Sequence, residues 1–206
     1  MERSMTPSVQ EQGGMTDGQI DKAVDIFRSA LRKHRMELGT NAVQQVLGIG
    51  ELGPELLAVF RKRVEAVSDM IVRRVKVDRD QTPQRVLDAT GRKQYTDSDV
   101  VTAMPCGEGE EVEFHFFKLG RYVNDNELEK EYELRGFKPA DPYSLAAVNK
   151  ADPAFADDHP NGTHWQDAKG RWCYAAFHRW SGERRLYVGR RAGDWDGSWW
   201  FAGLRK

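Results

Sequence analysis

The chain has 206 residues, of which 31 are Lys or Arg and 32 are Asp or Glu, so its formal net charge is −1. This balance gives no overall attraction to nucleic acid or to a charged membrane surface, and no apolar run approaches the ~18 residues that a membrane span needs. The two cysteines, Cys106 and Cys173, make no disulfide framework and indicate a reducing compartment, so we expect a cytoplasmic protein with no membrane segment.

The charge is unevenly distributed along the chain. The net charge by segment is −2 for residues 1–60, +5 for 61–93, −10 for 94–167 and +6 for 168–206. All six tryptophans lie between Trp165 and Trp200, in or next to the second basic segment. Segments of opposite sign can pair within the molecule or leave a bipolar surface that steers a charged partner.

The first half of the chain has helical patterns. Residues 1–15 read as a disordered lead-in, and Thr16 with Gln19 forms a capping box at a helix start. Steps of three and four residues then put one apolar stripe on that helix, formed by Ile20, Val24, Phe27, Leu31, His34 and Leu38. A second helix is predicted from Pro54 to Val77, with a buried stripe of Leu56, Phe60, Val64, Val67, Ile71 and Val75. We therefore expect an antiparallel helical hairpin, followed by short helices near residues 82–89 and 96–104.

The second half of the chain adds strands. Val112, Phe114 and Phe116 alternate with other residues and predict a strand over 112–119. Asn124 and Asp141 are expected to cap two further helices. Four strands with short Gly-bearing connections follow, over 163–166, 171–180, 184–191 and 198–204, and predict a mostly antiparallel β-meander. The fold class is thus α+β, with a helical region at 16–104 and an α+β region at 105–206 that can form one domain with it.

Several segments resemble those of a family of uncharacterised bacterial proteins. Between Glu131 and Lys206 the chain contains ELRGFKPADPYSLAAVNKADPAFADD, HPNGTHWQDAKGRWCYAAF and WWFAGLRK, and between Glu51 and Met104 it contains RVKVDRDQTPQ and DATGRKQYTD. The resemblance covers most of the chain. It implies a bacterial origin and a single architectural unit, and it implies no activity, ligand or catalytic residue.

Two motifs that suggest chemistry have ordinary structural explanations. Gly107-Glu108-Gly109 resembles a phosphate loop, but three glutamates crowd it and a strand rather than a helix follows. The same acidic setting disfavours a thiolate at Cys106. Cys173 and His178 lie five residues apart in one predicted strand, so their side chains point to opposite faces and cannot act as nucleophile and base.

A polar cluster offers a metal hypothesis. Asp157, Asp158, His159 and His164 lie close together in sequence, with Asp167 nearby. Imidazole and carboxylate groups can hold a divalent metal that keeps positions open for chemistry. Their spacing matches no metalloenzyme signature, and turn and cap roles explain the aspartates equally well.

The tryptophan-rich strands offer the preferred site. In strand 171–180 one face carries Trp172, Tyr174, His178 and Trp180, and we expect small residues on the other face to let a helix approach. Rings among arginines suit single-stranded nucleic acid, because bases stack on rings and guanidinium groups hold phosphates. The candidate ligand-binding residues are Trp172, Tyr174, His178, Arg179, Trp180, Arg184, Arg185, Arg190 and Arg191. The alternative is that these rings fill the core.

The sequence accordingly favours a non-catalytic binding or interaction protein without a cofactor, whose partner is nucleic acid or an acidic protein. Two other classes stay open. One is a metal-dependent enzyme that uses Asp158, His159 and His164, and the other is an oligomeric structural or assembly protein that uses the helical hairpin.

Overall fold

The computed structural model describes residues 14–65, 70–190 and 193–206, and the chain divides into two units, Met1–Ala66 and Val67–Lys206. The sequence places the division at residue 104/105 instead. Most of the expected lead-in at 1–15 lies outside the described residues. The two helices before residue 104 belong to the second unit because their apolar residues, Val86 and Val100 among them, join the core that packs on the sheet.

The first unit is helical in its described part. It contains α1 (Asp17–Lys33), a 3-10 turn (Arg35–Glu37), α2 (Thr40–Gly48) and α3 (Leu52–Glu65). The predicted capping box is confirmed, since the side chain of Thr16 accepts from the backbone N–H of Gln19 and the side chain of Gln19 accepts from that of Thr16. The predicted apolar stripe is not buried, because α1 and α2 contain no buried residue.

The predicted helix from Pro54 to Val77 is wrong in its second half. The helix α3 ends at Glu65, and Met70–Lys76 forms a strand, β1, that pairs antiparallel with Glu111–Lys118. The spacing of Ile71 and Val75 fits a helical stripe and an alternating strand equally well. The strand forms because β-branched residues there suit a pleated surface and a partner strand is present.

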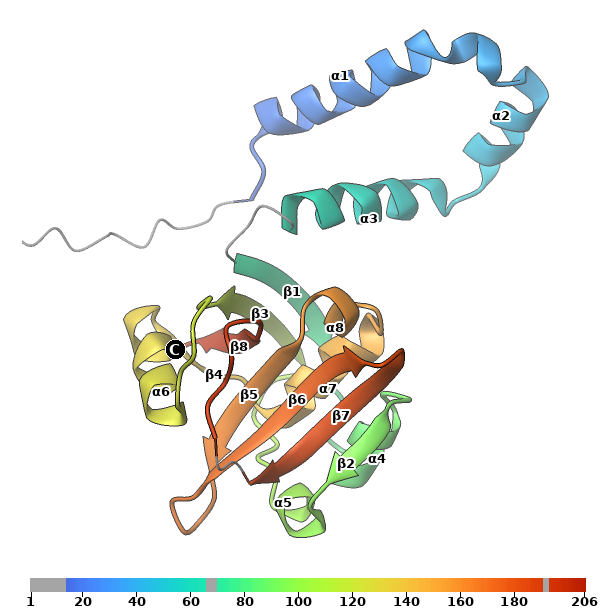
Figure 1. The fold of residues 1–206 in the computed structure, drawn as a ribbon. Coiled ribbons are helices and arrows are strands. Elements are labelled where there is room, and N and C mark those ends of the chain that lie inside the picture. The colour runs from blue at the N-terminus through green and yellow to red at the C-terminus, as the bar shows by residue number, and fades with distance from the viewer. Residues whose placement is uncertain (1–13, 66–69, 191–192) are drawn as a thin grey trace, which may run out of the picture. The chain divides into compact units, whose positions relative to one another are not determined.

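The second unit is a mixed sheet with helices. Its helices are α4 (Pro83–Asp88), α5 (Ser98–Thr102), α6 (Asp125–Leu134), α7 (Pro142–Ala151) and α8 (Phe155–Asp158). Its strands are β1 (Met70–Lys76), β2 (Lys93–Thr96), β3 (Glu111–Lys118), β4 (Phe137–Pro139), β5 (Asn161–Gln166), β6 (Trp172–Trp180), β7 (Glu183–Arg190) and β8 (Trp200–Arg205). The strand order is β1-β3-β8-β5-β6-β7-β2, with β4 paired to β8 (Figure 1). The α+β class is confirmed.

Local signals predicted most of these elements. Asn124 and Glu127 form the expected capping box of α6, and Asp141 caps α7 through the N–H of Ser144. The cap of α5 is Asp97 rather than Thr96, because Thr96 belongs to the short strand β2. The sequence does not predict β2, which pairs parallel with β7.

The predicted meander is correct for three strands and wrong for the fourth. Strands β5, β6 and β7 follow one another antiparallel. Strand β8 lies instead between β3 and β5, antiparallel to the first and parallel to the second. The described part of the connection before β8, residues 193–199, packs on one face of the sheet, where Trp195 is fully buried beside Ala176 and Phe201.

Each face of the sheet has its own hydrophobic cluster. Cys173, Ala175 and Phe177 of β6 pack in the larger cluster together with residues of α4, α5, α7 and α8. Ala176 of β6 lies in the smaller cluster, with Leu128 of α6 and the buried Trp195. The small side chains of β6 thus face the helices, as the sequence predicts. The other face is covered at one end only, which leaves the β6-β7-β2 end for the candidate site.

Candidate functional site

Strand register gathers the exposed rings at one edge of the sheet. His178 of β6 lies opposite Arg185 of β7, and Lys93 of β2 lies beside the same arginine. Residues directly opposite one another in neighbouring strands share a face. We call this patch the aromatic surface, and it consists of Lys93, Tyr95, His178, Trp180, Arg185 and Tyr187.

The rings of the aromatic surface contact one another. Tyr95 and Tyr187 stack at 4.9 Å between ring centroids with an interplanar angle of 11°. The ring of His178 lies 5.3 Å from that of Tyr187 and 6.4 Å from that of Trp180. A stacked pair holds both side chains in one orientation before any ligand arrives, which lowers the entropy that binding would cost.

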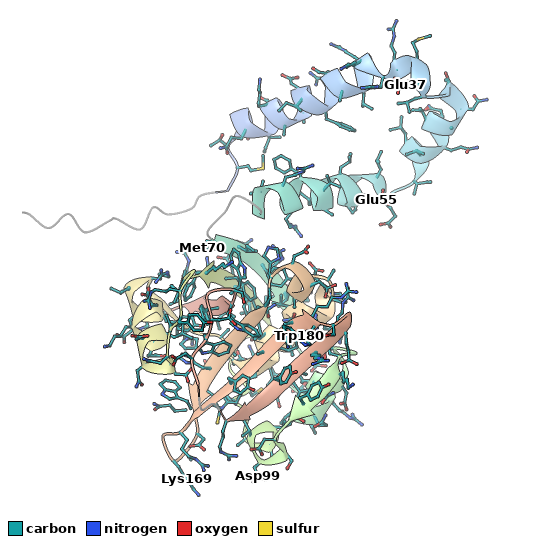
Figure 2. All side chains as sticks on the ribbon, in the orientation of Figure 1. Glu37, Glu55, Met70, Asp99, Lys169 and Trp180 are labelled. Carbon is teal, nitrogen blue, oxygen red and sulfur yellow. The ribbon has the colours of Figure 1, made fainter. Side chains whose placement is uncertain are left out.

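The aromatic surface is accessible to a partner. The side chain of Trp180, labelled in Figure 2 on β6, is 61% exposed, and Tyr95 is 39% exposed. His178 and Tyr187 are half-buried. Rings that only fill a core are covered by other residues. The exposed rings of this surface instead have faces on which a planar ligand can stack.

The charge of the aromatic surface is small and positive. Lys93 Nζ lies 3.1 Å from Glu183 Oε1, and Arg185 Nε lies 2.9 Å from Glu183 Oε2. Lys93 and Arg185 thus share one carboxylate, whose pKa is held below its usual value mainly by the hydrogen bond from Lys93. Burial, and then the neighbouring Arg185, lower the pKa of His178, so its ring is neutral at pH 7.

Most of the expected arginines are not on this face. Arg179 and Arg184 lie opposite one another on the helix-covered face, and both pair with Asp157, Arg184 at 2.8 Å and Arg179 at 3.4 Å. Arg190 is on the same side and pairs with Asp97 at 2.6 Å. The alternation of strand side chains places them there, since Cys173 and Phe177 share their face. Arg191 lies outside the described residues.

Trp172 and Tyr174 share the face of the aromatic surface but lie toward its covered end. The ring of Trp172 stacks on His164 at 4.5 Å, and its indole N–H donates to Asn126. Tyr174 packs edge-on against Trp195 at 5.9 Å. Both side chains are half-buried, so they support the face rather than extend its exposed part.

His164 belongs to a polar cluster that the sequence does not predict. Its Nδ1 lies 2.9 Å from Asp125 Oδ1, which also accepts the indole N–H of Trp195, and its Nε2 lies 3.2 Å from Glu129 Oε2. Burial opposes the charged ring, but the two carboxylates of Asp125 and Glu129 together outweigh burial and raise the pKa of His164. The cluster lies beside a cleft of about 840 Å³. The sequence signal that could have predicted part of this cluster is the capping motif of α6, because it places Asp125 and Glu129 on one helix.

The two histidines of the metal hypothesis pack against different neighbours. The ring of His159 packs against Phe155 at 5.1 Å and Trp200 at 5.2 Å, whereas His164 lies between Trp172 and Tyr132. Within residues 14–65, 70–190 and 193–206, no group of three or more His, Cys, Asp or Glu side chains is arranged to hold a metal ion.

The loop at 106–110 wraps around the side chain of Arg79. Arg79 donates to the carbonyl oxygens of Cys106, Glu108 and Gly109, with the last at 2.6 Å. The same guanidinium lies 3.1 Å from Asp141 Oδ1, and both side chains are largely buried. Carbonyl oxygens that converge on an arginine cannot cradle a phosphate, which agrees with the sequence analysis of this loop.

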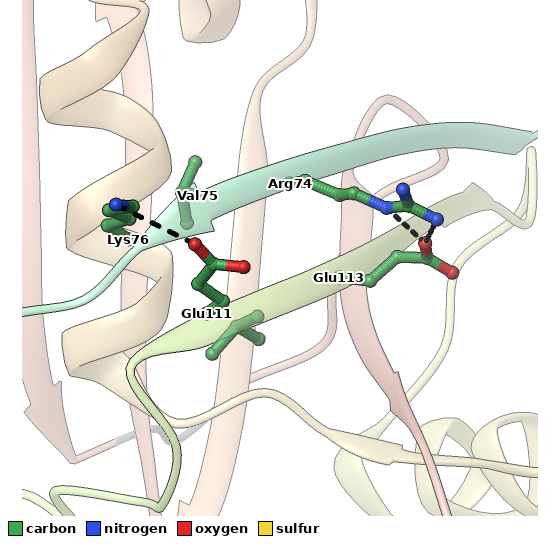
Figure 3. Close-up of a pocket in the computed structure, with 6 residues that line it drawn as sticks. Arg74, Val75, Lys76, Glu111 and Glu113 are labelled. Atoms are coloured by element: carbon green, nitrogen blue, oxygen red, sulfur yellow. Dashed lines mark hydrogen bonds and ion pairs between the residues drawn. The ribbon is translucent and has the colours of Figure 1, made fainter.

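A second hollow lies on the edge strand β1 and its neighbour β3 (Figure 3). Its volume is about 450 Å³, and its charged side chains form ion pairs across the two strands. Arg74 lies 2.5 Å from Glu113, and Lys76 lies 3.7 Å from Glu111. Because these opposite charges are matched by strand register, the hollow presents no excess charge to a ligand.

Comparisons with known proteins give no relative. No protein-family model matches the sequence, and neither the curated proteins nor the solved structures give a match to the chain. In the part of the chain that the structure describes, none of the helices combines the length and the apolar character needed to cross a membrane.

Proposed function

We propose that the protein is a non-catalytic binding protein that holds single-stranded nucleic acid on its aromatic surface. The observation that carries the proposal is the stacked Tyr95–Tyr187 pair beside the exposed Trp180, on an open sheet face that also carries Lys93 and Arg185. Rings on a sheet face stack with unpaired bases, and nearby cations contact the phosphates.

The charges of the surface set the expected strength of binding. The two cations on the face allow at most about two phosphate contacts, and both already share the carboxylate of Glu183. The logarithm of the affinity should therefore fall with the logarithm of the salt concentration with a slope no steeper than about −1.4. This is a weak dependence, because the other arginines of the basic segment are paired with aspartates on the opposite face. Stacking is therefore expected to supply most of the affinity, at about 1–3 kcal/mol per base.

The test is a titration of labelled single-stranded RNA and DNA with the full chain at two salt concentrations. We expect Trp180→Ala to weaken binding by about 5- to 150-fold, which corresponds to the loss of one stacked base. The matched control is Tyr122→Ala, since Tyr122 is 72% exposed and lies outside the aromatic surface.

Three results would contradict the proposal. They are no binding at low salt, equal weakening by Trp180→Ala and Tyr122→Ala, and a salt slope far steeper than two contacts allow. If oligonucleotides do not bind but a neutral sugar or an acidic protein does, the surface is assigned to that partner instead.

The proposal includes a cytoplasmic location. Cys106 and Cys173 are free thiols, the second buried, and burial raises its pKa. Free cysteines suit a reducing compartment. The family of uncharacterised bacterial proteins that the sequence resembles would then share a role in binding nucleic acid, with no metal or cofactor required.

A further inference from the structure

The helix α1 has an apolar face that no described residue of its own unit buries. The face is formed by Ile20, Val24, Phe27 and Leu31, with exposed fractions between 43% and 47%. The apolar residues of α3 are exposed as well, with Phe60 at 39% and Val64 at 47%, so α3 does not cover α1. Most of the stability of a helix in a protein comes from packing of its amphipathic face, so the 17-residue α1 would be stabilised by a partner there.

One flank of this face carries charges in a symmetric order. At 100° per residue, Asp17, Asp21, Arg28 and Arg32 fall within about 60° of one another on the same side of the apolar stripe, and Asp25 lies about 20° beyond them. Among the four residues next to the stripe, the two acids come first and the two bases last, and each pair is four residues apart. When such a helix is turned end to end, its acidic half faces the basic half of an identical helix.

We propose that α1 packs antiparallel against α1 of a second copy of this chain. In the register that superimposes the two charge pairs, Asp21 faces Arg28 of the partner subunit and Asp17 faces Arg32 of the partner subunit. The same register puts Val24 and Phe27 at the centre of the contact. A two-fold axis repeats each pair, so the interface is self-complementary in both shape and charge.

The charge pattern distinguishes a second copy from other occupants. In a two-fold symmetric pair, the spacing between the two acidic residues must equal the spacing between the two basic residues that they face. A partner of another kind does not require this equality. Antiparallel packing also places the positive end of each helix dipole beside the negative end of the other. The pair that Arg28 makes within α1, with Asp25 at 2.5 Å, is exposed on both sides and costs little to exchange.

The experiment uses the full chain and reverses the charges in two variants. Asp17→Lys with Asp21→Lys makes the flank basic, and Arg28→Glu with Arg32→Glu makes it acidic. We expect the unaltered chain to have the mass of a dimer by analytical ultracentrifugation. Each variant should dissociate, with a dissociation constant raised at least tenfold, and an equimolar mixture of the two should recover the dimer.

A control variant changes charges on the opposite side of the same helix. Lys22→Glu with Lys33→Glu should leave the dimer intact, since neither residue flanks the apolar face. A monomeric unaltered chain, two variants that both stay dimeric, or a mixture that stays monomeric would each overturn the proposal. Recovery in the mixture also shows that the variants have kept their helix, so misfolding cannot produce the expected result.

Discussion

Gly107 lies in the loop that wraps around Arg79, and both its backbone conformation and its surroundings require a glycine. Its φ is +69°, and a Cβ built on it would lie 2.1 Å from Asp141 Oδ2. The glycine-rich sequence predicts a break in regular structure, which is confirmed, and it predicts no phosphate site. It could not predict Arg79 as the bound group, because that residue is 27 positions from Cys106 and only the folded chain brings them together.

Gly107→Ala should destabilise the protein more than Gly91→Ala does. Both glycines have positive φ, at +69° and +64°, so both variants lose about 1–2 kcal/mol to backbone strain. A Cβ at Gly91 meets nothing within 4 Å, whereas the one at Gly107 must push the Asp141 carboxylate from Arg79. Urea unfolding of the two variants measures the difference, and equal losses would show that the Asp141 contact is unimportant.

Elements with local signals were predictable, and elements defined by distant partners were not. The caps Asn124 and Asp141 mark α6 and α7 because a capping side chain bonds to backbone three residues away. Strands β1 and β8 differ from expectation because their neighbours are set by long-range pairing. The same reason hides β2, a four-residue strand whose Tyr95 and Thr96 were its only β-forming signal.

Substitutions in β1 test its strand assignment. Val72 is 41% exposed, so Val72→Ala should destabilise a strand by up to about 1 kcal/mol, whereas in a helix the same change would stabilise. Ile71 is 1% exposed, and Ile71→Ala should cost about 2–5 kcal/mol through lost packing. Urea unfolding of both variants measures the change in the free energy of unfolding. If Val72→Ala stabilises the protein, the strand assignment is contradicted.

At the scale of the whole molecule, the sequence predicts the α+β class and the alternation of β6, but not which charges reach the open face. Alternation alone puts the rings on one side and Cys173 on the other. Asp157 of α8 and Asp97, the cap of α5, pair with Arg179, Arg184 and Arg190 on the opposite face. The described cations of the open face are Arg185 and the added Lys93, and both share the carboxylate of Glu183. Stacking rather than charge is therefore the central element of the proposed function.

The most direct test of that function follows the six tryptophan indoles by ¹H–¹⁵N NMR while a single-stranded oligonucleotide is added. The signal of Trp180 is assigned by its loss in Trp180→Phe. We predict that it shifts most, that the half-buried Trp199 near His178 shifts less, and that the buried Trp195 and Trp200 stay in place. An unchanged Trp180 signal, or shifts confined to Trp165 and Trp172 beside the His164 cleft, would contradict binding on the aromatic surface.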